Sequence, residues 1–344
     1  MQEVTVHGAG IFGLSIAWAC MARGAKVQII DPNGPLAGAS GGLVGALAPH
    51  VPENWNDKKQ FQFESLLMAA DFWREVEIVS GLPSGYARSG RIQPLATDRQ
   101  LELARVRMES AAALWQGRAE WRVVGENPAP GWAPDSATGA WVVDTLTARM
   151  HPRMAGASLL AALGARGVTV QAEAAPRGAQ VWATGAAGLA ELSTTLGRAV
   201  GGAVKGQSAS FACVMADKPQ VYAEALHVIG HADGTVAIGS TSERDFDDPT
   251  STDEQLDALI AKARALVPAL RDAPILTRWA GLRPRARSRA PMLGPWPGRP
   301  GHFIANGGFK IGFGMAPKVA EVMADLVLDG VDTIPEGFRV EASL

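Results

Sequence analysis

The sequence predicts an α/β fold, α+β over the chain as a whole, in which strand–helix units at both ends flank a mostly antiparallel sheet. A glycine-rich turn joins a strand-like run to a helical run within residues 4–23, and a second helical run occupies residues 320–330. Between these ends, the strand-like runs 226–231 and 235–240 are separated by Ala-Asp-Gly, a hairpin signal. We therefore expect a discontinuous first domain that is interrupted by an inserted sheet domain.

The composition places the chain among globular proteins. Of its 344 residues, 47% are apolar and 19% charged, which is enough to bury a large core. The formal net charge of −2 gives no general attraction to nucleic acid or to an anionic membrane. Cys20 and Cys213 form no metal or redox spacing, so we expect buried thiols. The N-terminus lacks the features of a signal peptide, and no apolar run reaches the length of about 18 residues that spans a membrane, so we expect a cytoplasmic protein.

The N-terminal turn has the pattern of a dinucleotide-binding site. A β-prone run precedes Gly8, Gly10 and Gly13, a helical run follows, and a second β-prone run, residues 26–30, ends in Asp31. Gly8 permits the tight turn, Gly10 lets backbone N–H groups approach a pyrophosphate, and Gly13 lets the helix pack against the strand. The helix N-terminus favours phosphate, and Asp31 is placed to accept hydrogen bonds from ribose hydroxyls. The alternative is an ordinary glycine-rich turn.

Two further stretches of small residues fit a bound cofactor. Residues 37–46 (AGASGGLVGA) hold too many small residues for a helix or strand interior, and such backbone can lie against a flat or phosphate-bearing ligand. A flexible surface loop is the alternative, although Leu43 and Val44 favour packing. A small-residue turn at 184–188 follows a buried strand at 180–183 and is a second such place. The glycine motif alone does not separate NAD from FAD.

Apolar periodicity predicts the remaining elements. Four more helices are expected, at residues 57–80, 98–115, 151–167 and 253–267. The first has an apolar face of Phe63, Leu66, Leu67, Ala70 and Trp73. Further strands are expected at 168–170 and 207–214, and a loop or hairpin rich in Pro, Gly and Ala at 124–140.

An ordered set of motifs resembles one family, the flavin-dependent amine oxidases of the D-amino-acid oxidase, glycine oxidase and monomeric sarcosine oxidase group. The motifs are GAGIFG at 8–13, ASGGLVGA at 39–46, VKGQ at 204–207, IGSTSE at 238–243, AGLRP at 280–284 and GGFKIGFGMAP at 307–317. The resemblance implies a glutathione-reductase-like Rossmann domain that binds FAD and a substrate domain built on a mostly antiparallel sheet. We expect the FAD-binding domain at 1–80, 145–205 and 281–344, and the substrate domain at 81–144 and 206–280.

The resemblance also implies which residues hold the cofactor. The sarcosine oxidase branch attaches FAD through a cysteine after its RP motif, whereas residues 285–300 contain none, so we expect non-covalent FAD. The expected cofactor-binding residues are Gly8, Gly10, Ile11, Phe12, Gly13, Asp31, Pro32, Ala37, Ser40, Gly41, Gly42, Leu43, Thr184, Gly185, Gly308, Phe309, Lys310, Ile311, Gly312 and Phe313.

Two cations match residues that the family uses with its substrate. Arg283, in the GLRP motif, matches the arginine that holds the substrate carboxylate, and a guanidinium fork suits two parallel hydrogen bonds to a carboxylate. It could instead belong to a basic surface run, since arginines alternate along 283–289. Lys310 matches the lysine that the sarcosine oxidase branch uses with a carboxylate. It could hold the carboxylate, support negative charge on the flavin, or close a surface turn.

The chain departs from the family at several positions. His227 stands where glycine oxidases have a substrate-contacting tyrosine, and it could be a hydrogen-bond partner, a pH-dependent cation or an ordinary sheet histidine. Tyr222 could serve in place of that tyrosine. Ala237 stands where the sarcosine oxidase branch has a lysine that promotes reaction with oxygen. His50 could face the active site or be a loop histidine.

The resemblance implies FAD-dependent oxidation of a small amino acid or N-alkyl amino acid of the glycine, sarcosine or D-amino acid type. Hydride transfer to flavin N5 gives an imine, and oxygen then gives hydrogen peroxide. The alternatives are an amine dehydrogenase, alone or as one subunit of a complex, that passes electrons to a carrier; a tRNA-modification-type FAD oxidoreductase; and a flavoprotein without turnover. We expect a small-molecule partner and no nucleic acid, membrane or metal; the oligomeric state is open.

Overall fold

The computed structural model describes residues 2–344 and confirms the predicted fold class. A six-stranded sheet has the order β15-β16-β9-β1-β2-β8 and is parallel except for the edge strand β15. Its strands are β1 (Glu3–His7), β2 (Lys26–Ile30), β8 (Val170–Gln171), β9 (Ala179–Trp182), β15 (Met292–Pro295) and β16 (His302–Asn306). Strand β1, the glycine turn, the helix at Ile11–Ala22 and strand β2 form the predicted dinucleotide-binding unit.

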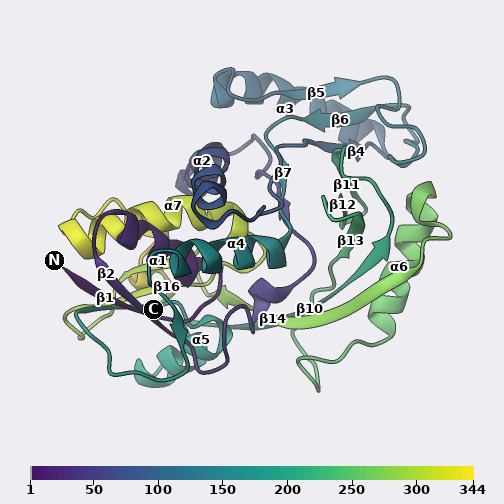
Figure 1. Cartoon of the computed structure of the whole chain (residues 1–344). Helices are drawn as coiled ribbons and strands as arrows, with labels where there is room; N and C mark the ends of the chain where they lie inside the picture. Colours follow the sequence, from purple (N-terminus) through teal and green to yellow (C-terminus); the bar gives the residue numbers. More distant parts are fainter. Residues whose placement is uncertain (1) are drawn as a thin grey trace.

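Helices cover both faces of this sheet. Four of them pack on one another and on one face: α1 (Ile11–Ala22), α2 (Asp57–Ser80), α4 (Pro152–Gly164) and α7 (Gly312–Ala324). Figure 1 shows this layer on the left of the molecule. The short helix α5 (Gly185–Thr195) packs through Leu189 and Leu192 on Ile304, whereas Ala305, the next residue of β16, belongs to the core under α1 and α7. Because side chains alternate along a strand, α5 covers the opposite face.

The second sheet has eight strands in the order β14-β10-β13-β12-β11-β4-β6-β5, antiparallel except for the pair β11 and β4. Its strands are β4 (Arg91–Pro94), β5 (Trp121–Val124), β6 (Trp141–Asp144), β10 (Gly201–Ala212), β11 (Gln220–Ala223), β12 (Leu226–Gly230), β13 (Thr235–Gly239) and β14 (Ile275–Ala286). Helix α3 (Asp98–Trp115) packs on β5, and a small ladder joins β3 (Ala46–Leu47) to β7 (Ala148–Arg149).

The two faces of the eight-stranded sheet have different chemistry. One face is apolar and packs Phe211, Val228 and Ile238 against α6 (Glu254–Leu266), which lies on the outer side of the sheet in Figure 1. On the other face, strand pairing aligns Tyr222 with His227, His227 with Gly239, and Gly239 with Ser208. The face that carries these polar residues borders the cavity described below.

Several predicted elements are confirmed, including the helices at 57–80 and 98–115 and the hairpin of β12 and β13. The predicted apolar face of α2 was partly wrong, because Ala70 is exposed and Leu67 only half-buried, while Ala69 and Val76 are buried. The expected strand at 168–170 is only the two-residue β8. No helix within residues 2–344 is long and apolar enough to cross a membrane.

The largest errors concern segments whose structure depends on distant contacts. The small-residue turn after Trp182 is in fact helix α5, which its packing on the sheet stabilises. Strand β14 was not predicted, because its Gly, Pro and Arg residues disguise a strand that pairs with β10 along most of its length. The division into two domains stays a prediction; β10 and β14 run without a break through residues 205–206 and 280–281, where we place two of its boundaries.

Candidate active site

A cavity of about 1040 Å³ lies between the two sheets. It extends from the glycine turn after β1, past the loop 37–46, to the polar face of the eight-stranded sheet and the loop 305–314. Segments that lie at both ends and in the middle of the chain therefore build one site.

The glycine turn has the close approaches that its motif predicts. Gly8 has a φ of +101°, and a Cβ atom there would lie 2.4 Å from the carbonyl oxygen of Ala183. A Cβ at Gly13 would lie 1.9 Å from the carbonyl oxygen of Gly8. Both distances are far below contact distance, so helix α1 and strand β9 can approach this turn only if both residues are glycine.

Three helices begin at the wall of this cavity, and none is closed by the side chain of its own N-cap residue. The N-caps are Gly10 for α1, Thr184 for α5 and Ile311 for α7, and all three line the cavity. None of these helices has an acidic residue in its first turn. The helices α2, α3, α4 and α6 are instead capped by the side chains of Asn56, Thr97, His151 and Asp253. N-termini whose N-cap residue has no capping side chain leave backbone donors and a positive dipole at the cavity wall, so this cavity suits an anionic ligand.

Polar side chains complete the glycine-turn end of the cavity. Ser40 accepts a hydrogen bond of 2.9 Å at its Oγ from the backbone N–H of Ile11, which ties loop 37–46 to the start of α1. Asp31 accepts hydrogen bonds from the backbone N–H groups of Ala9, at 2.8 Å, and Asn33, at 3.0 Å. Each carboxylate oxygen has a further lone pair, so Asp31 can still accept hydrogen bonds from a ligand.

Every residue expected to hold the cofactor lines this cavity except Gly13 and Gly41. Gly13 does not face the cavity but packs directly against Gly8, which does. Gly41 packs against the loop backbone, since a Cβ there would lie 2.5 Å from the carbonyl oxygen of Leu36. Sequence reasoning missed Trp279 and Ser208, which also line the cavity. Trp279 approaches loop 37–46, since its ring would lie 3.3 Å from a Cβ at Gly42. Trp279 could have been found from the sequence only if residues 275–286 had been recognised as strand β14.

Arg283 lies on the cavity wall and is 8% exposed. Its guanidinium lies across the backbone of Gly206 in the neighbouring strand, and its Nη1 donates a hydrogen bond of 3.2 Å to the carbonyl oxygen of Thr241. Burial lowers the pKa of Arg283 to about 10, and the negative charge of Glu243 opposes this shift. The group therefore stays cationic at neutral pH.

Lys310 also lines the cavity and is open to it. Its Nζ lies 5.8 Å from the ring centroid of Phe309, whose other cationic neighbour is Arg285, with 5.6 Å from Cζ to the centroid. Burial among protein atoms, and then the charge of Arg283, lower the pKa of Lys310. Arg283 and Lys310 thus give this part of the cavity wall two positive charges.

Tyr222 and His227 line the same cavity, with ring centroids 4.6 Å apart. Burial, followed by the charges of Arg91 and Lys310, lowers the pKa of His227 to about 3, so His227 is neutral at physiological pH. This lowered pKa favours a hydrogen-bonding role for His227 over that of a pH-dependent cation. His50 does not line the cavity, and its ring faces the side-chain oxygen of Gln62. Ala237 is fully buried in β13.

These residues fit FAD. The glycine turn and the starts of α1 and α5 suit its pyrophosphate, although the N–H of Ile11 already donates to Ser40. Asp31 suits its ribose, and the start of α7 suits an electron-rich ring edge. When bound, FAD would be held by these backbone groups. Neither Cys20 nor Cys213 lines the cavity, so neither is placed to attach it covalently.

Comparisons with known proteins agree with this reading. A family model described as FAD-dependent oxidoreductase matches residues 3–326. The chain is 32% identical to glycine oxidase of Pseudomonas aeruginosa over 376 aligned positions, which cover 95% of this chain and 94% of that protein. The crystal structure of glycine oxidase from Geobacillus kaustophilus superposes with a TM-score of 0.84 at 21% identity, covering 99% of both chains. The crystal structure of iminodiacetate oxidase from Chelativorans sp. BNC1 superposes with a TM-score of 0.83 at 23% identity, covering 98% of both chains. The chain therefore belongs to the FAD-dependent oxidoreductase family that includes glycine oxidase and is itself an FAD-dependent amino acid oxidoreductase.

Proposed function

We propose that this site oxidises a small amino acid or N-alkyl amino acid, of the glycine, sarcosine or D-amino acid type, at the carbon between its amine and its carboxylate. The observation that carries the proposal is the state of Arg283. It is a buried cation on the cavity wall, and no carboxylate of residues 2–344 lies within 4.0 Å of its nitrogen atoms. A buried charge requires a partner, and a guanidinium fork suits a carboxylate. The substrate carboxylate is that partner.

The other residues of the wall have supporting roles in this proposal. Lys310 adds a second positive charge, which stabilises either the substrate carboxylate or negative charge on the reduced cofactor. Tyr222 and the neutral His227 offer hydrogen-bonding groups beside the two cations. Fixing the carboxylate restricts the orientations that the Cα–H bond can take, and orientation is the protein's main contribution.

When bound, FAD would supply the two-electron redox chemistry by which the amine is oxidised to an imine, which water then hydrolyses. An amine bound in its neutral form needs no general base on the protein for this step. The two electrons then pass to dioxygen, which gives hydrogen peroxide, or to a separate carrier.

A dehydrogenase is the second candidate. Ala237, where the resemblance places an oxygen-promoting lysine, is uncharged and 0% exposed. A site without that cation is expected to react slowly with dioxygen and to pass its electrons to a carrier instead.

Anaerobic visible spectra of the purified FAD-bound protein test the proposal. We expect the flavin bands to bleach with glycine, sarcosine or a small D-amino acid, and recovery in air then separates the oxidase from the dehydrogenase. Arg283→Met should raise the KM for the amino acid by about 100-fold or more, because it removes a charged hydrogen-bonding partner. Bound flavin that no small amine reduces would refute the proposed substrate class.

A further inference from the structure

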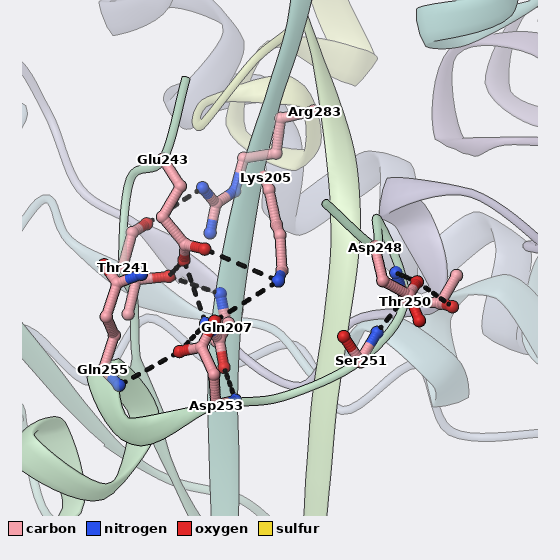
Figure 2. A network of polar contacts seen from close by, with 10 residues as sticks. All are labelled: Lys205, Gln207, Thr241, Glu243, Asp248, Thr250, Ser251, Asp253, Gln255 and Arg283. Carbon is pink, nitrogen blue, oxygen red and sulfur yellow. Dashed lines mark hydrogen bonds and ion pairs between the residues drawn. The ribbon is translucent and has the colours of Figure 1, made fainter. Parts of the chain in front are cut away.

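A buried polar network stands directly behind Arg283 (Figure 2). Its central charges are Lys205 of β10, which is 2% exposed, and Glu243, which is 7% exposed. The Nζ of Lys205 lies 3.6 Å from a carboxylate oxygen of Glu243 and 3.5 Å from one of Asp253, the N-cap of α6. Charges this deeply buried require specific partners, so the network has a fixed arrangement.

The backbone holds this arrangement in place. The segment 241–243 pairs with β10, since the N–H of Lys205 donates to the carbonyl of Glu243 at 2.9 Å and the N–H of Glu243 donates to that of Lys205 at 3.0 Å. Gln207 donates from its Nε2 to Glu243, at 3.1 Å, and to Asp253, at 2.7 Å. The hydroxyl of Thr241 donates to the same Glu243 oxygen that Gln207 reaches. Glu243 is therefore held by Lys205, Gln207 and Thr241.

The network touches Arg283 without forming an ion pair with it. Thr241 accepts a hydrogen bond from Arg283 Nη1 through its carbonyl oxygen, and its hydroxyl contacts Glu243. Glu243 is close enough to influence the charge state of Arg283. Yet within residues 2–344 no carboxylate oxygen comes within 4.0 Å of an Arg283 nitrogen. Figure 2 shows Glu243 directed toward Lys205 and Gln207.

We propose that Lys205 is a positioning residue that holds Glu243 away from Arg283 and so keeps the guanidinium free for the substrate. The proposal rests on the proposed function, in which Arg283 binds the substrate carboxylate. Without the charge of Lys205, Arg283 is a cation close enough to take its place as the partner of Glu243, since both Arg283 and Glu243 contact Thr241. A buried carboxylate that loses its partner is strongly destabilised, so Glu243 would turn to Arg283 and compete with the substrate for the same fork.

The test uses the FAD-bound protein and acetate as a probe, because acetate carries the carboxylate alone. Its dissociation constant is measured from the change that it causes in the visible flavin spectrum. Lys205→Met should raise this constant by about 10-fold or more, since one partner of a buried charge pair is removed. The double variant with Glu243→Gln should return it to within about threefold of the wild type, because the competing anion is gone. A merely structural role for Lys205 predicts no such rescue.

Two further variants keep the outcome decisive. Lys262→Met removes the ion pair of Lys262 with Glu224 (3.2 Å), which lies outside the cavity, and should leave acetate binding unchanged. Glu243→Gln alone should bind acetate at least as tightly as the wild type, and this holds even if Lys205→Met fails to fold. Weaker binding by Glu243→Gln, or a Lys205→Met defect that the second substitution does not repair, would overturn the proposal.

The outcomes separate this inference from the proposed function. If Arg283→Met leaves acetate binding unchanged, the assignment of Arg283 as the carboxylate partner is wrong. If Arg283→Met abolishes binding whereas Lys205→Met binds as the wild type does, the inference about Lys205 alone is wrong.

Discussion

Substitution of Gly206 by alanine should displace Arg283 without changing any charge. Gly206 lies in β10 and pairs with Gly281, and the guanidinium of Arg283 lies across its Cα. A Cβ atom at position 206 would lie 1.8 Å from Nη2, 2.0 Å from Cζ and 2.1 Å from Nη1 of Arg283. All three contacts are shorter than any that real Cβ atoms make, so the guanidinium must move.

The size of the movement follows from these distances. Ordinary contact begins at 3.4 Å, so Nη2, now at 1.8 Å from the added atom, must move by about 1.6 Å. A displacement of about 1 Å at a group that orients the substrate can lower a rate by about 100-fold. We therefore expect Gly206→Ala to lower kcat/KM by about 100-fold, or about 2.7 kcal/mol of transition-state stabilisation.

The assay is the rate of anaerobic flavin reduction by the best small amino acid, measured with FAD content and melting temperature. Gly202→Ala is the matched control, because Gly202 lies in the same strand and a Cβ there would meet nothing within 4 Å. The control should react as the wild type does. A folded, FAD-replete Gly206→Ala protein that is reduced at the wild-type rate would show that the position of the Arg283 guanidinium does not matter for the reaction.

Two further predictions concern the cofactor and the pH dependence of stability. Ile311→Asp places a carboxylate at the uncapped start of α7, and it should weaken FAD retention by about tenfold relative to the neutral control Ile311→Asn, as measured by the ratio of flavin to protein absorbance. Equal retention by the two variants would argue against an electrostatic role for that helix. The pH dependence comes from His231, which is 1% exposed. Its Nε2 atom lies 3.1 Å from the carbonyl oxygen of Leu43, and burial lowers its pKa to about 4. In the unfolded chain the imidazole of His231 takes up a proton near pH 6.5, whereas in the folded protein it does so only near pH 4. The free energy of unfolding therefore falls as the pH drops from 6.5 toward 4, by about 2 kcal/mol at pH 5. The melting temperature of the wild type should fall from pH 7 to pH 5 more steeply than that of His231→Asn, and parallel curves would contradict this.

Local sequence patterns determined the N-terminal half of the candidate site. Gly8, Gly10 and Gly13 between two strands, with Asp31 after the second, need no distant partner to be recognised. The reason is that turn geometry and helix packing over some 25 residues depend on the spacing of small residues. Apolar periodicity defined α2 and α3 for the same reason, since a helix is built from contacts three and four residues apart.

Only the tertiary structure decided how the substrate wall is built. Lys205, Thr241 and Glu243 stand in motifs that contributed to the family resemblance, but no local pattern gave any of them a role. They meet Arg283 because β10, the segment after β13 and β14 lie side by side. Likewise, the N-cap residues of α1, α5 and α7 make no capping bond with their own side chains, and this has meaning only once all three helices are seen to begin at one cavity. Strand pairing and burial set these relations, and both depend on residues far apart in the chain.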